Sequence, residues 1–80
     1  MTEREFNRQL GANIRDARKA AGITQRALAA AIGLWPAQMS RMERGEQLIG
    51  INRLRWLAGA LGVAEVALLP RLVTASAEFT

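Results

Sequence analysis

The sequence predicts an all-α domain of five short helices. Three observations support this fold class. Apolar residues recur at steps of three and four, glycines divide the chain at helix-length intervals, and no segment shows the period-2 alternation of a strand. A chain of 80 residues is at most one small domain. We predict this domain over residues 1–69, with a C-terminal tail over residues 70–80.

The first predicted helix begins after Thr2, because Thr2 and Glu5 have the spacing of a capping box. Gly22 fits the left-handed position just beyond its end. Its apolar stripe is formed by Phe6, Leu10, Ile14, Ala17 and Ala21. The opposite side is basic, with Arg4, Arg8, Arg15 and Lys19. This basic side either contacts phosphates or is an ordinary solvated face.

Two short helices follow the first. Thr24 is a candidate N-cap for a helix over Gln25–Ile32 that stops at Gly33. Pro36 suits the first turn of a third helix, where its missing N–H is no loss. This helix is expected to run to about Arg44 and to end at Gly45.

Two more helices complete the predicted domain. A fourth helix is expected between Gly50 and Gly62. Its apolar stripe consists of Ile51, Leu54, Leu57, Ala58 and Leu61. A fifth helix over about Ala64–Leu69 ends near Pro70.

The composition excludes most catalytic chemistry. The chain has no Cys, His or Tyr, so thiol nucleophiles, the usual zinc ligands and the commonest general base are missing. Ser40 therefore has no His or Cys partner, and we expect no enzyme, no metal site and no cofactor. The net charge is +4 and ten of the eleven cations are Arg. Arginine suits phosphates and guanine edges, although a GC-rich genome also encodes it by default.

Export and membrane insertion are not expected. Met1 is not followed by a basic segment and an apolar stretch, so no signal peptide is visible. The longest apolar runs, Ala27–Trp35 and Trp56–Ala64, are about half the ~18 residues of a membrane span. The predicted location is cytoplasmic.

The stretch from Thr24 to Gly45 is the most informative part of the chain. Two short helices joined by a tight turn must cross steeply, which requires small residues at the crossing and a turn that accepts positive φ. Ala29 is the small residue and Gly33 the permissive one. The apolar contacts beneath are supplied by Leu28, Ile32, Met39 and Met42.

With these residues, the chain resembles the Cro/lambda-repressor-like (Xre-type) helix-turn-helix DNA-binding domains. The resemblance covers about residues 8–69. It is carried by Ile14-Arg15, Arg18-Lys19, Gly22-Ile23-Thr24-Gln25, Leu28-Ala29, Ile32-Gly33-Leu34, Met39-Ser40-Arg41-Met42-Glu43-Arg44-Gly45 and Ala58-Gly59-Ala60-Leu61-Gly62-Val63. It implies a compact five-helix domain with the helix-turn-helix at the second and third helices.

The resemblance also implies which residues meet double-stranded DNA. The third helix would enter the major groove and reach base edges from Ala37, Gln38, Ser40 and Arg41. Arginine can bind guanine and glutamine can bind adenine through two bonds each, and an alanine methyl can touch a thymine methyl. Phosphates would be contacted by Gln25, Arg44, Arg15 and Arg53.

Two further residues match a structural pair of the family. Arg18 and Glu43 would form a buried ion pair that ties the first helix to the recognition helix. The chain also departs from the family. Trp35 stands where a hydroxyl often caps the recognition helix, Pro36 and Ala37 replace polar residues, and the loop after Gly45 lacks basic residues.

A further departure is Trp56, which lies opposite the stripe of the fourth helix. We predict a homodimer interface that includes Trp56, Leu48, Ile49 and Leu72. The alternative is a tail that folds back over Trp56. A dimer would place two recognition helices about 34–36 Å apart on a palindromic operator.

The predicted function is therefore a homodimeric transcription regulator, in the first place a repressor. Two alternatives stay open. One is a restriction–modification controller protein, whose loop the segment Glu43–Gln47 with Ile49 and Ile51 resembles, and the other is an antitoxin-type interaction module. A protein partner, such as a toxin or RNA polymerase, also stays open. The operator and any effector cannot be predicted from the sequence.

Overall fold

The structure, a computed structural model, describes residues 1–71 and contains five helices in this range. They are α1 (Glu3–Ala20), α2 (Gln25–Ala31), α3 (Pro36–Glu43), α4 (Ile51–Leu61) and α5 (Glu65–Leu68). No strand occurs among the described residues. The predicted all-α class and the order of the five helices are confirmed. The helices end within about one residue of the predicted positions, which is the usual uncertainty at helix ends.

Local side-chain bonds explain where the helices begin. Thr2 and Glu5 form the predicted capping box, and the Thr24 hydroxyl accepts the Ala27 N–H at 3.0 Å. α3 is capped differently, because Trp35 has no oxygen in its side chain. Instead, the Gln38 Oε1 accepts the N–H of Trp35 at 2.9 Å. Each of the three helices therefore starts with a backbone N–H satisfied by a nearby side chain.

The core is a single apolar cluster to which all five helices contribute. Its buried members are Leu10, Ile14, Leu28, Ala29, Met39, Met42, Leu54, Leu57, Ala58, Leu61 and Leu68. Of the predicted stripes, Phe6 and Ala17 are half-buried and pack against this cluster, and two residues lie outside it. Ile51 is exposed because it is the first residue of α4, beyond the reach of the core. Ala21 is also exposed, because α1 ends one residue before it.

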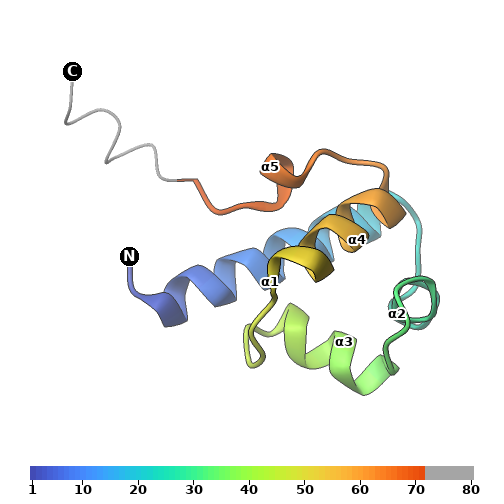
Figure 1. The fold of residues 1–80 in the computed structure, drawn as a ribbon, viewed down its shortest axis with the longest axis horizontal. Coiled ribbons are helices and arrows are strands. Elements are labelled where there is room, and N and C mark those ends of the chain that lie inside the picture. Colours follow the sequence, from blue (N-terminus) through green and yellow to red (C-terminus); the bar gives the residue numbers. More distant parts are fainter. Residues whose placement is uncertain (72–80) are drawn as a thin grey trace.

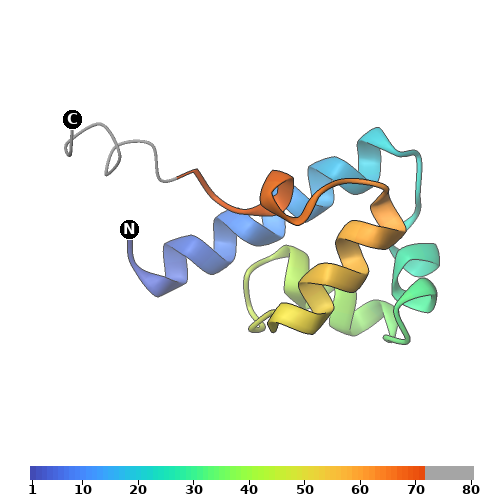
Figure 2. The ribbon, with the colours of Figure 1, turned by 45° about the horizontal axis from the view of Figure 1, so that its top comes forward.

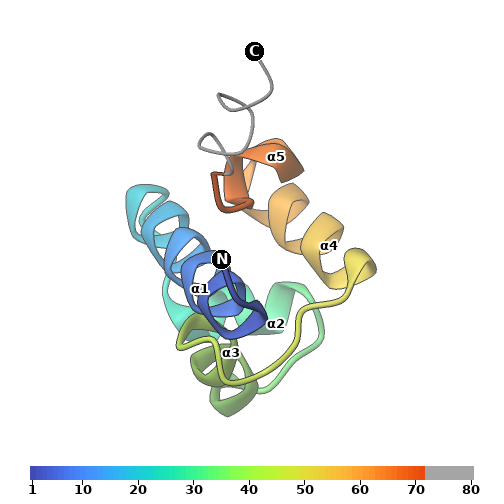
Figure 3. The ribbon, with the colours of Figure 1, turned by 90° about the vertical axis from the view of Figure 1, so that its left-hand side faces the viewer.

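The long α1 crosses behind α4 in the view of Figure 1 and packs against α3, α4 and α5. α3 and α5 lie on opposite sides of the molecule, and α4 lies between α5 and the α2–α3 pair (Figures 1 and 2). The view of Figure 3 confirms this order. Asn13 fixes α5 against α1, because its Nδ2 donates to the carbonyl oxygen of Leu68 at 2.9 Å. This order leaves the α2–α3 side of the molecule open.

Two glycines let α1 approach the end of α3 closely. A Cβ on Gly11 would lie 2.6 Å from the carbonyl oxygen of Glu43. A Cβ on Gly45 would lie 2.5 Å from the Cα of Arg8, and Gly45 also has a φ of +75°. A side chain at either position would push the helices apart. The close approach sets the first half of α1 against the C-terminal end of α3.

Residues 1–71 contain neither a membrane-spanning helix nor a cluster of metal-binding side chains. None of the described helices has the length and apolar character needed to cross a membrane. The described residues also form no group of three or more side chains suited to hold a metal ion.

Candidate nucleic-acid interface

The turn between α2 and α3 fixes the relative positions of these two helices. Gly33 has a φ of +73°, as its place in the turn predicts. The Leu34 N–H then donates to the carbonyl oxygen of Ala29 at 2.8 Å. Ala29 is fully buried where the two helices cross. Small and permissive residues therefore allow the steep crossing that the sequence predicts.

A buried polar network ties α1, α2 and α3 together. The Arg18 Nε donates to Glu43 Oε2 at 2.7 Å, and its Nη2 donates to Glu43 Oε1 at 3.1 Å. Only 12% of the Arg18 side chain and 3% of the Glu43 side chain are exposed. Gln25 Nε2 donates to the same Oε1 at 3.0 Å, and Arg18 Nη1 donates to the Ile23 carbonyl at 3.0 Å. The carboxylate is thus fully bonded, which a buried charge requires.

A basic groove opens directly above this network. It has a volume of about 340 Å³ and is lined by Arg15, Arg18, Lys19, Gln25, Ser40, Glu43 and Arg44. Four of these residues are cations, and the single carboxylate is already paired with Arg18. The groove therefore carries excess positive charge, which attracts phosphate oxygens. It brings together three of the four predicted phosphate ligands, Gln25, Arg44 and Arg15.

The fourth predicted phosphate ligand, Arg53, is placed elsewhere. It lies on α4 and lines a separate hollow with Gly50, Ile51, Asn52 and Trp56. Conversely, Lys19 lines the basic groove; the sequence placed it on the basic side of the first helix but not among the four predicted phosphate ligands. Its position one helical turn after Arg15 is the signal that places both on one side of α1.

The outer side of α3 carries the predicted base-contacting residues. Ala37 and Arg41 are exposed, and Gln38 and Ser40 are half-buried. Two of these polar side chains already have partners: Gln38 Oε1 caps α3, and Ser40 Oγ accepts from Arg44 Nη1 at 2.7 Å. Arg41 forms no hydrogen bond with another side chain among the described residues, so its guanidinium is available to a ligand.

Arg44 and Glu46 form a second ion pair at the end of α3. Arg44 Nε and Nη2 donate to the two Glu46 oxygens at 2.9 and 3.1 Å. About half of each side chain is exposed, 56% and 53%. Hydrogen bonds from Arg44, together with the charges of Arg44 and Arg41, hold the pKa of Glu46 below its ordinary value. This carboxylate therefore lies close to two of the predicted DNA-binding cations.

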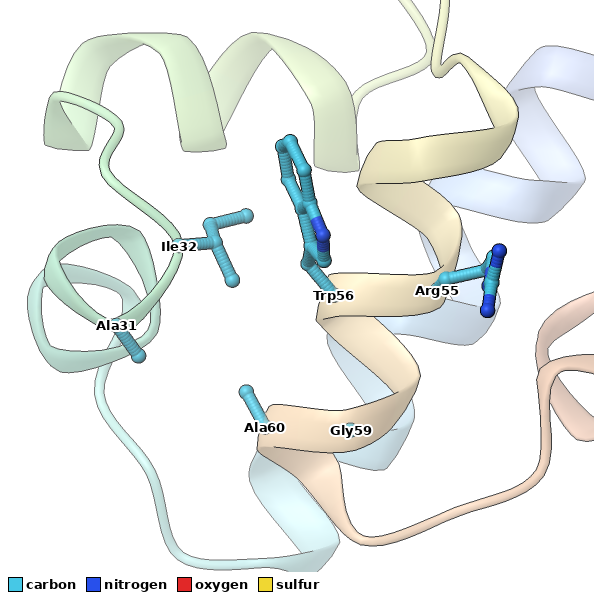
Figure 4. A pocket seen from close by; sticks show the side chains of 6 residues that line it. All are labelled: Ala31, Ile32, Arg55, Trp56, Gly59 and Ala60. Atoms are coloured by element: carbon cyan, nitrogen blue, oxygen red, sulfur yellow. The ribbon is translucent and has the colours of Figure 1, made fainter.

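The residues predicted for a dimer interface fall into three groups. Trp56 and Leu48 are exposed, as an interface requires. Ile49 is half-buried and packs against the core, so it adds less to this surface than predicted. Leu72 lies outside the described residues. Trp56 and Ile32 point into the space between α4 and the α2–α3 turn (Figure 4).

The family follows from comparison with known proteins. A helix-turn-helix domain family matches residues 9–72. The chain belongs to this family. Its α2 and α3 are the two helices of the motif, and the predicted Xre-type membership is confirmed. No curated protein sequence is detectably similar to this helix-turn-helix chain.

Solved structures of helix-turn-helix regulators have the same fold. The restriction–modification controller protein C.AhdI from Aeromonas hydrophila superposes with a TM-score of 0.81 at 26% identity, over 86% of this chain and 100% of that one. The clp gene regulator ClgR from C. glutamicum gives 0.77 at 29% identity, over 94% of both chains. An epoxidase from S. wedmorenis gives 0.76 at 26% identity but is matched over only 34% of its length.

Proposed function

We propose that this helix-turn-helix domain is a sequence-specific transcription regulator that binds double-stranded DNA as a homodimer and acts as a repressor. The observation that carries the proposal is the juxtaposition of the basic groove with the exposed side of α3. Phosphates of one strand bind in the groove at Arg15, Lys19 and Gln25. α3 then enters the major groove next to that strand.

Gln25 has a double role in this proposal. One N–H of its amide is bonded to Glu43, which fixes the orientation of the side chain. The amide has a second N–H, and this donor is directed to a phosphate. The buried Glu43 thus positions a phosphate ligand without touching DNA.

Selection of bound sites from random DNA duplexes tests the proposal. A palindrome with half-sites about one helical turn apart is expected. With the selected site, Arg41→Ala lowers affinity by about 1–3 kcal/mol and relaxes the preference at one base pair. Gln25→Ala lowers affinity for selected and random duplexes alike. Failure to enrich any sequence contradicts the proposal.

The dimer is supported by the exposed surface of α4. Trp56 is 55% exposed and stands between two hollows. The larger has a volume of about 670 Å³ and is lined by Ala31, Ile32, Arg55, Trp56, Gly59 and Ala60 (Figure 4). A large side chain next to a hollow that contains the small residues Ala31, Gly59 and Ala60 is suited to an isologous contact, in which each Trp56 enters the partner's hollow.

Sedimentation equilibrium tests the dimer. The native chain is expected to sediment as a dimer and Trp56→Arg as a monomer, because an arginine places a charge in the apolar contact. Val66→Ser removes another exposed apolar side chain, outside both hollows, and serves as the control. An intact dimer in the Trp56→Arg variant excludes this interface.

A restriction–modification controller role is the second candidate. It is favoured by the likeness to C.AhdI, which is matched over its whole length. A restriction gene beside the gene of this chain in the source genome distinguishes this role from that of a general repressor.

A further inference from the structure

Trp35 is the most exposed large apolar side chain among residues 1–71, at 76%. It occupies the N-cap of α3, where a hydroxyl or carboxylate side chain normally stabilises the helix. The Gln38 side chain caps the helix instead. The indole is therefore neither part of the core nor needed as a cap, and its exposure has no structural explanation within the described chain.

The polar side chains next to Trp35 have limited capacity to read bases. Gln38 Oε1 already accepts from the Trp35 N–H, so only one of its two lone pairs remains for the amino group of an adenine. Ser40 Oγ accepts from Arg44. The first turn of α3 therefore presents mainly apolar groups, from the exposed Trp35, Pro36 and Ala37. In the major groove, the apolar feature of a base pair is the 5-methyl group of thymine.

A hollow next to Trp35 indicates which partner lies against the indole. It has a volume of about 470 Å³ and is lined by Arg26, Ala30, Leu34, Trp35 and Pro36. Arg26 is exposed and takes part in none of the ion pairs within residues 1–71. A cation beside an apolar ring matches a nucleotide, which offers a phosphate and an apolar base edge. The hollow also adjoins the side of α3 proposed above to face DNA.

We propose that Trp35 is a specificity-determining residue that reads thymine methyl groups at the base pairs facing the first turn of α3 in each half-site. Ala37 contacts the same methyl-bearing edge, and Arg26 binds a phosphate of that strand. The inference rests on the proposed DNA-binding function. It assigns the base preference of the first turn of α3, whereas Arg41 reads guanine further along the helix.

Replacement of thymine by deoxyuridine tests the inference, because it removes only the methyl group. The duplex selected by the native protein is expected to contain thymines at the half-site positions that face the first turn of α3. Substituting deoxyuridine there is expected to weaken binding about fourfold for each methyl buried against the indole. The same substitution in the spacer between the half-sites is the control and is expected to change nothing.

A double-mutant cycle assigns the effect to Trp35. In Trp35→Ala, the thymine and deoxyuridine duplexes are expected to bind equally, whereas Trp35→Phe retains most of the difference. Trp35→Thr removes the indole but supplies a capping hydroxyl, so this variant is expected to stay folded. If its circular dichroism spectrum matches that of the native protein, its loss of base preference does not come from unfolding. If the deoxyuridine effect persists in Trp35→Ala, or if it is missing in the native protein, the inference is wrong.

Fluorescence gives an independent measurement, since Trp35 and Trp56 are the only tryptophans of the chain. In Trp56→Phe, the emission of Trp35 is expected to be quenched and shielded from acrylamide when the selected duplex binds. Emission that stays fully accessible in the bound state overturns the inference. A selection that enriches no sequence instead overturns the proposed function, so the two failures are distinguishable.

Discussion

Two arginine–glutamate pairs lie at the end of the recognition helix, and they differ in exposure rather than in bonding. Arg18–Glu43 and Arg44–Glu46 each have one short bond, 2.7 and 2.9 Å, and one of 3.1 Å. The first pair is almost fully buried, whereas more than half of each side chain in the second is exposed. Glu43 and Arg44 are neighbours in the sequence, yet one side chain points into the protein and the other into solvent.

This difference in exposure distinguishes the pair that stabilises the fold from the pair that is available to DNA. A buried charge that loses its partner stays desolvated, so the pair is strongly required once it exists. An exposed pair exchanges its partner for water at little expense. We therefore assign Arg18–Glu43 to holding α3 in position. Arg44–Glu46 remains free to rearrange when a phosphate approaches.

The largest predicted effect is that of Glu43→Gln. It leaves Arg18 buried without a counter-charge and is expected to destabilise the protein by about 3–5 kcal/mol. Urea denaturation followed by circular dichroism measures the loss. Glu46→Gln is the matched control and is expected to change stability by less than about 0.5 kcal/mol. Equal losses in the two variants would remove the distinction between the pairs.

The second prediction replaces both buried charges. Arg18→Met combined with Glu43→Leu is expected to recover most of the stability lost in Glu43→Gln, because no unpaired charge remains. DNA binding is not expected to recover fully, since Gln25 loses the acceptor that orients it. Denaturation and affinity for the selected duplex are measured on the same variant. Full recovery of both would mean that Glu43 does not position Gln25.

The third prediction concerns binding rather than stability. Glu46→Gln is expected to raise DNA affinity about twofold to fivefold, because it frees Arg44 and removes a carboxylate near Arg41. Fluorescence anisotropy against salt concentration measures this. If Arg44 gains one phosphate contact, the slope of log affinity against log salt becomes steeper by about 0.9 per protomer. An unchanged slope with unchanged affinity contradicts a role for Arg44 at the backbone.

The two pairs also show what could be predicted from the sequence. Helix starts and turns were predictable because caps, glycines and Pro36 act within a few residues of the chain. The Arg18–Glu43 contact spans 25 positions, so it was accessible only through the family resemblance. The Gln25–Glu43 bond and the close approach at Gly11 depend on how three helices pack, and no local pattern reports this.

The errors and omissions of the sequence-based prediction also come from features that depend on how the helices pack. Ile51 has the correct spacing for the core stripe, but helical period does not show how far along α4 the core extends. Nor does the period show which polar atoms bond to each other. Gln38 and Ser40 were predicted as base readers, yet one acceptor atom of each is bonded within the protein. Arg41 is the predicted base reader that keeps its polar atoms free of side-chain partners.

The smallest predicted effect is the titration of Glu46. Its pKa is lowered from 4.5, first by the hydrogen bonds from Arg44. The pKa of Glu46 is lower in the folded state than in the unfolded state. The pair therefore contributes fully to folding stability above the ordinary pKa, and this contribution is lost as the pH falls through the folded-state pKa. NMR titration of the side-chain carboxyl carbon measures this midpoint. In Arg44→Ala the midpoint is expected to rise toward the ordinary pKa. Arg18→Ala is the control: it affects only the buried pair, so the folded form of this variant is expected to keep the native midpoint. A midpoint that does not respond to Arg44→Ala would show that the exposed pair is not formed in solution, and Arg44 would then meet DNA with no bond to break.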